Sequence, residues 1–223
     1  MNDAPSLPHL HHHHGDFAAF AQVMIESAKT RFGPLWWGVW DQYVAPHLPA
    51  DGTVVDLGCG PGGLFRTLRA HHPQVHVTGV EIQPAMLVEA RKLAQELGNC
   101  DLVEADLALQ LPLTDGTADA VTASMLLHEM PEPLPVLREM QRILKPGAPF
   151  LIYDWVKQPL RQYVDGKVPT GEVLQHFREH CLYTPDDLLF LCETAGLHVV
   201  EVIGRRGGDY AMLAGVSSGL QSR

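Results

Sequence analysis

Residues 53–63 constrain the fold more than any other part of this sequence. Val54, Val55 and Leu57 form a short apolar run, which is typical of a strand buried on both faces. Residues 64–71 then have the pattern of a helix. Between the two lie four glycines: Gly58, Gly60, Gly62 and Gly63. A strand, a glycine turn and a helix form the first half of a βαβ unit. Glycines there let the backbone approach a ligand at the start of the helix, where unpaired N–H groups point outward.

The carboxylate of Asp56 indicates which ligand this turn holds. Three of the glycines satisfy the G-x-G-x-x-G spacing of dinucleotide sites, but any tight turn between a strand and a helix can carry such glycines. A carboxylate two residues before the first glycine repels a pyrophosphate and attracts an aminium group. Residues 56–62, Asp-Leu-Gly-Cys-Gly-Pro-Gly, resemble the first motif of the class I S-adenosylmethionine-dependent methyltransferases. A turn without any ligand is the alternative. The resemblance implies that five residues hold the methionine part of the cofactor: Asp56, Gly58, Cys59, Gly60 and Gly62.

Two further acidic residues stand at the ends of predicted strands. Residues 75–82 form the second predicted strand, and Glu81 lies near its end, about 20 residues beyond the glycine turn. A carboxylate there can accept hydrogen bonds from both ribose hydroxyls, in methyltransferases and in nicotinamide enzymes alike, and Ile82 is assigned to the same site. Asp106 ends the third strand. In the resembling family an acidic residue here receives the adenine amino group, and the neighbouring Leu107 supplies a backbone contact. A solvated carboxylate is the simpler alternative for both acids.

The fourth predicted strand, residues 119–124, leads into the expected site of reaction. In open α/β sheets ligands bind beyond the carboxyl ends of the strands where the strand order reverses, here between the first and fourth strands. Ser124 is therefore assigned to the cofactor site. His128 can act as a general base, hydrogen-bond the cofactor or cap the next helix. Asp154, at the end of the fifth strand, is a candidate for the substrate site. Residues 137–155 resemble the last motif block of the same family, with Ala148 where a second glycine is usual.

The remaining segments are predicted to belong to one methyltransferase domain, residues 16–223, which follows a mobile tail rich in histidine at residues 1–15. The tail histidines can bind metal or belong to an expression tag, and no metal is assigned. Residues 16–50 are predicted to form a helical cap, in which Trp37 and Trp40 either pin helices to the sheet or line the substrate site. The segment 157–183 is predicted to cover that site, with an ordinary surface excursion as the alternative. A helix beginning at Thr184-Pro185 and a final hairpin, residues 198–203 and 210–216, complete the domain.

Composition limits the class of partner. The net charge of -10 argues against nucleic acid, because phosphate contacts need a basic surface. No apolar run approaches the roughly 20 residues of a membrane span, and the first residues do not resemble a signal peptide. The four cysteines have no metal-binding spacing, which favours reduced thiols in the cytoplasm. The sequence leaves the oligomeric state open, a homodimer included.

The motifs occur in family order, and this makes the resemblance specific. It implies a Rossmann-like three-layer αβα sandwich whose seven-stranded mixed sheet has the order 3-2-1-4-5-7-6 with the last strand antiparallel. It also implies methyl transfer from S-adenosylmethionine to a small-molecule acceptor by in-line displacement. Two alternatives stay open: a protein that binds S-adenosylmethionine or S-adenosylhomocysteine without turnover, and a nicotinamide-dependent oxidoreductase.

Overall fold

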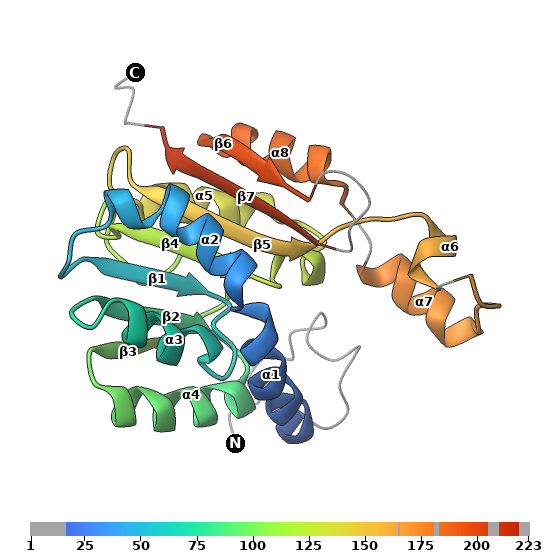
Figure 1. Cartoon of the computed structure of the whole chain (residues 1–223), viewed down its shortest axis with the longest axis horizontal. Helices are drawn as coiled ribbons and strands as arrows, with labels where there is room; N and C mark the ends of the chain where they lie inside the picture. The colour runs from blue at the N-terminus through green and yellow to red at the C-terminus, as the bar shows by residue number, and fades with distance from the viewer. Residues whose placement is uncertain (1–16, 165, 181–182, 205–209, 219–223) are drawn as a thin grey trace.

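A seven-stranded mixed sheet forms the centre of the protein in the computed structural model, which describes residues 17–164, 166–180, 183–204 and 210–218 (Figure 1). Its strand order is β3-β2-β1-β4-β5-β7-β6, as predicted. The first five strands pair in parallel, and β7 is antiparallel to both of its neighbours. In sheet order the strands are β3 (Cys100–Glu104), β2 (His76–Glu81), β1 (Thr53–Leu57), β4 (Ala120–Ser124), β5 (Pro149–Trp155), β7 (Tyr210–Ser217) and β6 (Leu197–Ile203).

Helices cover both faces of the sheet. The chain forms α1 (Phe17–Arg31), α2 (Pro34–Tyr43), α3 (Gly63–His71), α4 (Pro84–Leu97), α5 (Leu134–Ile143), α6 (Leu160–Tyr163), α7 (Gly171–His180) and α8 (Pro185–Thr194), with 3-10 turns η2 (Ala45–His47) and η3 (Leu127–Glu129). One apolar cluster joins α1–α4 to the face that carries Val54, and a second joins α5 and α8 to the face that carries Val55. Because successive strand residues point to opposite faces, the run 54–57 supplies both clusters.

The predicted elements are present, with boundaries that shift by a few residues at most. Strand β3 begins at Cys100 and ends at Glu104, so Asp106 lies beyond the strand rather than at its last position. Helix α7 begins at Gly171, and a further short helix, α6, precedes it. The tail at residues 1–15 and the predicted N-cap Asp16 lie outside the described residues. No helix in the described part of the chain is both long and apolar enough to cross a membrane.

The segment 157–183 stands beside the sheet rather than over it. Figure 1 shows α6 and α7 projecting from the edge of the body where β5 ends. The ring of Tyr163 lies 5.1 Å from that of Phe177 and 6.0 Å from that of Trp155, measured between ring centroids, so aromatic contacts hold the two helices to the end of β5. Whether this segment covers the substrate stays a prediction.

Helix α8 begins with the cap that its sequence predicts. The Thr184 hydroxyl accepts a hydrogen bond from the Asp187 N–H at 3.1 Å, and the Asp187 carboxylate accepts one from the Thr184 N–H at 2.8 Å. This reciprocal pair is a capping box, which satisfies two N–H groups that the helix leaves without a partner. Pro185 takes the first helical position, where a missing N–H has no effect. Helix α8 in turn packs on β6 and fixes the terminal edge of the sheet.

We expect Thr184→Ala to lower the free energy of unfolding by about 1 kcal/mol, because the substitution removes the side-chain acceptor of this cap. Urea unfolding followed by circular dichroism measures the change. The matched control is Thr194→Ala at the other end of α8, where the exposed hydroxyl only donates to the Phe190 carbonyl; its effect should stay within about 0.5 kcal/mol. Equal effects of the two substitutions would contradict the capping role.

Candidate functional site

The glycine turn after β1 adopts a conformation that L side chains rarely tolerate. Gly58 has a φ of 67° and Gly60 a φ of 54°. A Cβ on Gly58 would lie 2.8 Å from Leu126 Cδ1, whereas a Cβ on Gly60 would meet nothing within 4 Å. The N–H groups of Gly58 and Cys59 both donate to the Val80 carbonyl, which ties the turn to β2. The turn is therefore fixed on its sheet side and open on the side of Gly60.

Glu81 closes the turn from the end of β2. Its Oε2 accepts a hydrogen bond from the Gly60 N–H at 2.9 Å, and its Oε1 accepts from the N–H groups of Ile82 and Gln83 at 2.8 Å each. These three donors hold the carboxylate in one orientation. A carboxylate has about four acceptor positions, so Oε2 keeps one for a ligand hydroxyl.

Asp56 is buried at the end of β1, where only 3% of its surface is exposed. Its Oδ1 accepts a hydrogen bond from the Thr122 hydroxyl at 2.8 Å. Burial raises the pKa of Asp56 to about 7, against the opposing effects of the Thr122 hydrogen bond and the positive charge of Arg31. A cation bound beside Asp56 would favour its ionised form, so this carboxyl group is suited to a positively charged ligand.

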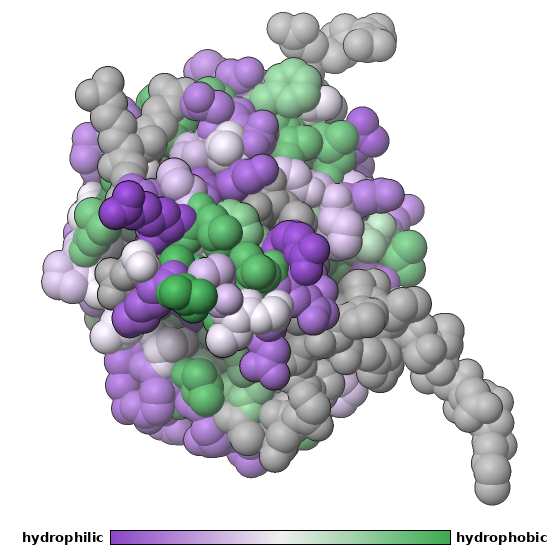
Figure 2. All heavy atoms as spheres, turned by 90° about the vertical axis from the view of Figure 1, so that its right-hand side faces the viewer, coloured by the Kyte–Doolittle hydropathy of each residue, from purple (hydrophilic) through white to green (hydrophobic). Residues whose placement is uncertain are grey.

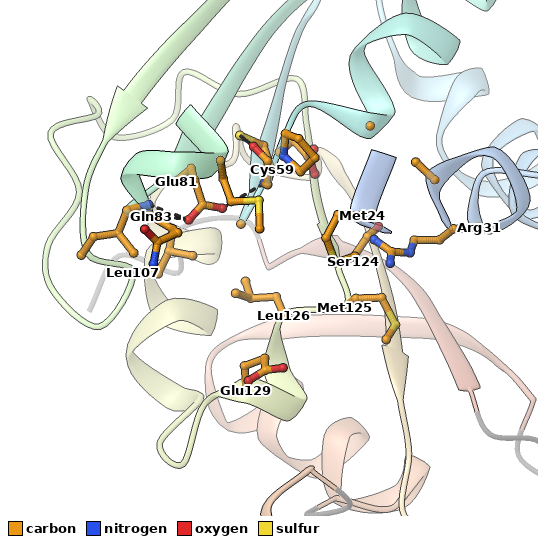
Figure 3. A pocket seen from close by; sticks show the side chains of 18 of the residues that line it. Met24, Arg31, Cys59, Glu81, Gln83, Leu107, Ser124, Met125, Leu126 and Glu129 are labelled. Carbon is orange, nitrogen blue, oxygen red and sulfur yellow. Dashed lines mark hydrogen bonds between the residues drawn. The ribbon is translucent and has the colours of Figure 1, made fainter. Parts of the chain in front are cut away.

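These groups meet in a cavity of about 420 Å³ at the carboxyl ends of β1, β2 and β4 (Figure 3). The cavity brings together most of the predicted site residues: Asp56, Gly58, Cys59, Gly60, Glu81, Ile82, Asp106, Leu107, Ser124 and His128. Ser124 has a buried hydroxyl with no hydrogen-bond partner in the described part of the chain. Figure 2 shows the side of the molecule towards which β1 and β5 point, with apolar side chains grouped at its centre among polar ones.

Four predicted site residues do not line this cavity, and two of them belong to the core. Trp37 and Trp40 were expected in the substrate site as one alternative, but both are buried and neither lines this cavity. Trp40 is fully buried and its Nε1 donates to His72 Nε2 at 2.9 Å, while the Trp37 ring stacks on His71 at 3.6 Å between centroids. Large aromatic surfaces gain more from this packing between α2 and α3 than from exposure in a pocket. Both rings belong to the apolar cluster that contains Val54 of β1 and Leu151 of β5, which agrees with the other alternative, that they pin helices to the sheet.

Gly62 and Asp154 also lie outside the cavity wall. Gly62 has a φ of 82° and faces Phe65 and Leu93, so it shapes the turn and its packing rather than contacting a ligand there. Asp154 is fully buried behind the end of β4. Its Oδ2 accepts from the N–H groups of Leu126 and Leu127 at 3.0 and 2.6 Å, which makes it a support for the site instead of a substrate contact.

His128 and Asp154 form a buried pair. The two atoms His128 Nδ1 and Asp154 Oδ1 lie 2.6 Å apart, and His128 Nε2 lies 3.3 Å from Glu129 Oε1. Burial alone would lower the pKa of His128, but the hydrogen bonds and charges of Asp154 and Glu129 outweigh it and raise the pKa to about 9. The imidazole is therefore charged near neutral pH.

Sequence reasoning missed the part of the wall that α1 supplies. Helix α1 carries an apolar stripe at helical spacing, and Phe20, Met24 and Ala28 of this stripe line the cavity. Arg31 continues that stripe three residues later and donates to the Ser27 hydroxyl at 3.1 Å. Burial lowers the pKa of Arg31, while the nearby Tyr153, Tyr210, Asp56 and Asp154 favour its charge. The helical spacing was the available signal, but nothing local shows which way such a stripe faces. The other missed wall residues are Phe32, Pro61, Gly63, Gln83, Met86, Met125, Leu126, Glu129, Met130 and Trp155.

The residues present fit S-adenosylmethionine, the cofactor that the resemblance implies. The fixed Glu81 carboxylate suits ribose hydroxyls, and Asp106 and Leu107 lie on the same side of the cavity. Asp56 suits a cation, and the open backbone at Gly60 admits close approach. Arg31 and the unpaired Ser124 hydroxyl at the far side can receive a carboxylate. The cavity thus offers acceptors and donors in the places where this zwitterionic sulfonium would need them.

Comparisons with known proteins indicate the family. A family model described as a methyltransferase domain matches residues 54–147. The ubiquinone/menaquinone biosynthesis C-methyltransferase UbiE of Brucella anthropi is 34% identical over 214 residues, covering 86% of this chain and 81% of that protein. Cycloartenol-C-24-methyltransferase 1 of Oryza sativa subsp. japonica is 38% identical over 105 residues, covering 46% of this chain and 30% of that protein.

The fold is also similar to a chain in the complex between the Haloferax volcanii Trm112 methyltransferase activator and the putative methyltransferase. That match has a TM-score of 0.71 and 20% identity, and it covers 93% of this chain and 100% of the other. The present chain spans half or less of the length of several curated relatives that it matches.

We expect Asp56→Asn to stabilise the ligand-free protein at pH 8 by on the order of 2 kcal/mol and to weaken its binding of S-adenosylmethionine. The raised pKa means that folded Asp56 holds its proton more tightly than unfolded Asp56. The wild type therefore loses stability as pH rises from about 4 to about 7, and the Asn variant, which keeps an acceptor for Thr122, lacks this loss. Urea unfolding at pH 5 and pH 8 and calorimetric titration measure the two effects.

The control for this comparison is Asp51→Asn, which changes an exposed acid outside the cavity. It should follow the wild type in both experiments. The same fall in stability between pH 5 and pH 8 in wild type and Asp56→Asn would show that Asp56 does not carry the effect.

Proposed function

The chain belongs to the class I S-adenosylmethionine-dependent methyltransferases, and we propose that it transfers a methyl group from this cofactor to a carbon atom of a small, largely apolar acceptor. Family membership rests on the UbiE relative, of which the chain covers 81% at 34% identity. The proposal adds two features to family membership: the acceptor atom is carbon, and the acceptor molecule is largely apolar.

The observation that carries the proposal is the set of large apolar side chains in the cavity wall. They come from α1, from the segment that follows β4 and from the end of β5: Phe20, Met24, Met125, Met130 and Trp155. Thioether and aromatic groups of this kind bind flat or branched hydrocarbon surfaces and adapt to their shape. The names of two relatives, a C-methyltransferase of ubiquinone and menaquinone biosynthesis and a cycloartenol-C-24-methyltransferase, support an acceptor of this kind.

The protein's contribution to the reaction is mainly positioning. S-adenosylmethionine supplies a methyl group on a sulfonium sulfur, which is already a good leaving group. Glu81 and Asp106 orient the nucleoside part, Asp56 favours the positive charge of the methionine part, and Arg31 with Ser124 binds its carboxylate. The apolar wall then holds the acceptor carbon in line with the methyl group and excludes water. Such alignment contributes up to about 7 to 11 kcal/mol to lowering a barrier.

Two other functions are alternatives to methyl transfer. A protein that binds the cofactor without turnover would share every cofactor contact, so only a reaction separates it from an enzyme. A nicotinamide-dependent oxidoreductase fits less well, because Asp56 would repel a pyrophosphate and because dinucleotide dehydrogenases lack a terminal antiparallel pair such as β6 and β7. A cytoplasmic location is part of the proposal. It is supported by Cys59, Cys100 and Cys192, which form no disulfide in the described structure.

We expect the protein to release S-adenosylhomocysteine when it is incubated with S-adenosylmethionine and a panel of apolar carbon acceptors, for example prenylated hydroquinones and cycloartenol. Mass spectrometry should find a methylated product with the new methyl group on carbon. Glu81→Ala is the matched control, because it removes an anchor of the cofactor site and should abolish both signals. Cofactor binding without product across the whole panel would favour the protein that binds without turnover.

A second expectation concerns Arg31→Met, which keeps an unbranched apolar stem and removes the charged guanidinium. We expect it to weaken binding of S-adenosylhomocysteine by about 10- to 100-fold, the usual effect of losing a hydrogen bond to a charged group. Binding of 5′-methylthioadenosine, which lacks the amino-acid carboxylate, should not change. Isothermal titration of both ligands measures the difference. An equal loss for the two ligands would show that Arg31 supports the cavity wall rather than a carboxylate.

A further inference from the structure

We propose that Glu129 is the catalytic base that removes a proton from the acceptor, and that His128 and Asp154 position it. This inference rests on the proposed function and adds to it the class of acceptor, one whose nucleophilic atom or its neighbour must lose a proton. The sequence left His128 three roles, as a general base, as a hydrogen-bond partner of the cofactor or as a helix cap.

Asp154 holds the turn after β4 through several hydrogen bonds. Its Oδ2 accepts from the N–H groups of Leu126 and Leu127, and its Oδ1 accepts from the Trp155 N–H at 2.7 Å. The same carboxylate lies 2.6 Å from His128 Nδ1. Backbone and imidazole are therefore held by one buried group, so the 3-10 turn that carries residues 127–129 has a defined orientation towards the cavity.

The imidazole of His128 lies between two carboxylates. Asp154 faces its Nδ1 and Glu129 its Nε2, at 2.6 and 3.3 Å. Each ring nitrogen faces an acceptor, and an imidazole satisfies two acceptors only when both nitrogens carry hydrogen. The raised pKa of His128, about 9, agrees with this geometry. An imidazolium has no lone pair with which to accept a proton, so His128 does not suit the role of base near neutral pH.

The side chains of Asp154, His128 and Glu129 differ in how far they are exposed. Along this chain of three groups the side chain of Asp154 is 0% exposed, that of His128 7% and that of Glu129 42%. Glu129 lines the cavity, and Figure 3 shows it below Leu126, on the same side of the cavity as Met125. Glu129 is thus the more exposed of the two carboxylates, and it lines the same cavity as the apolar side chains of Met125 and Met130.

The charges around this turn come from several elements. Asp154 belongs to β5, and Arg31 of α1 interacts with Asp154 through space. The Tyr183 hydroxyl donates to the carbonyl groups of Met130 and Pro131, next to Glu129. Helix α7, which packs against η3, carries these titratable residues: Glu172, His176, Arg178, Glu179 and His180. His128 Nε2 lies 3.3 Å from Glu129 Oε1, so removal of this positive charge should raise the proton affinity of Glu129.

The reaction balances with the groups present. The acceptor loses a proton from carbon or from a conjugated hydroxyl, and the Glu129 carboxylate forms the new O–H bond. The electron pair left on the acceptor forms the bond to the methyl carbon, and the pair of the broken carbon–sulfur bond stays on sulfur. An enol, a phenol or a hydroquinone is such an acceptor. A tertiary amine, which loses no proton when it is methylated, is not.

The decisive variant is Glu129→Gln, assayed in single turnovers with the panel member that the wild type methylates. We expect the rate to fall by about 10²- to 10⁴-fold, the usual contribution of a general base, with unchanged affinity for S-adenosylmethionine. Glu132→Gln, at an exposed acid outside the cavity three residues further on, is the matched control and should keep the wild-type rate. Equal rates for wild type and Glu129→Gln would overturn the inference.

A pH profile separates positioning from a purely structural role. His128→Asn keeps a hydrogen-bond donor but removes the positive charge, so Glu129 should hold its proton up to higher pH and the acidic limb of the rate profile should move upward. A structural role would lower the rate equally at every pH, and a loss as large as that of Glu129→Gln at all pH values would make His128 the base. If the wild type itself gives no product with any acceptor, the proposed function fails and this inference fails with it.

Discussion

The buried carboxylate of Asp154 is the interaction on which the reacting end of the site depends. An ionised group without water is expensive unless several donors compensate for it. Here the donors are backbone N–H groups of Leu126, Leu127 and Trp155 together with His128. Because these donors come from β5 and from the turn after β4, satisfying one charge also fixes the path of the chain between them. The left-handed backbone of Met125, with a φ of 58°, lies at the start of this turn, where such support can hold a sparsely populated conformation.

The cofactor end follows the opposite principle, since it keeps one charge poorly compensated. Asp56 has a single hydrogen bond from Thr122 in the described structure and a pKa of about 7. Glu81, on the next strand, accepts three backbone donors instead. The well-supported carboxylate shapes the turn whether or not a ligand is bound. The carboxyl group of Asp56, which has fewer hydrogen bonds, is stabilised most when a cation binds beside it. Part of the affinity for the ligand therefore comes from relief of the unfavourable burial of this group in the free protein.

Much of the fold was predictable because its signals are local. The run at Val54, the glycine turn and the cap at Thr184 each specify their own element, and the sheet order follows from the family resemblance. Most residues that meet in the cavity were predictable for the same reason, since the carboxyl ends of parallel strands must meet at one edge. The direction in which α1 and α2 face was not predictable. Their apolar stripes look alike in sequence, yet α1 lines the cavity and Trp40 of α2 is buried in the core. That choice is made by packing between distant segments: a Cβ on Gly63 would lie 2.6 Å from the Ala28 Cβ, so α1 rests directly on the glycine turn.

The same close approach explains why the two ends of the site act together. Gly63 lets α1 reach the turn that holds the cofactor, and this places Met24 and Arg31 beside Ser124 (Figure 3). A larger residue at Gly63 would push α1 away and open the cavity between the cofactor turn and the acceptor wall. In the proposed mechanism, the spacing between methyl donor and acceptor is thus set by the contact between α1 and the glycine turn. Transfer of a methyl group is sensitive to this spacing, because the reacting atoms must be aligned within a few tenths of an ångström. A glycine that touches no ligand in the proposed mechanism therefore determines where the acceptor can stand.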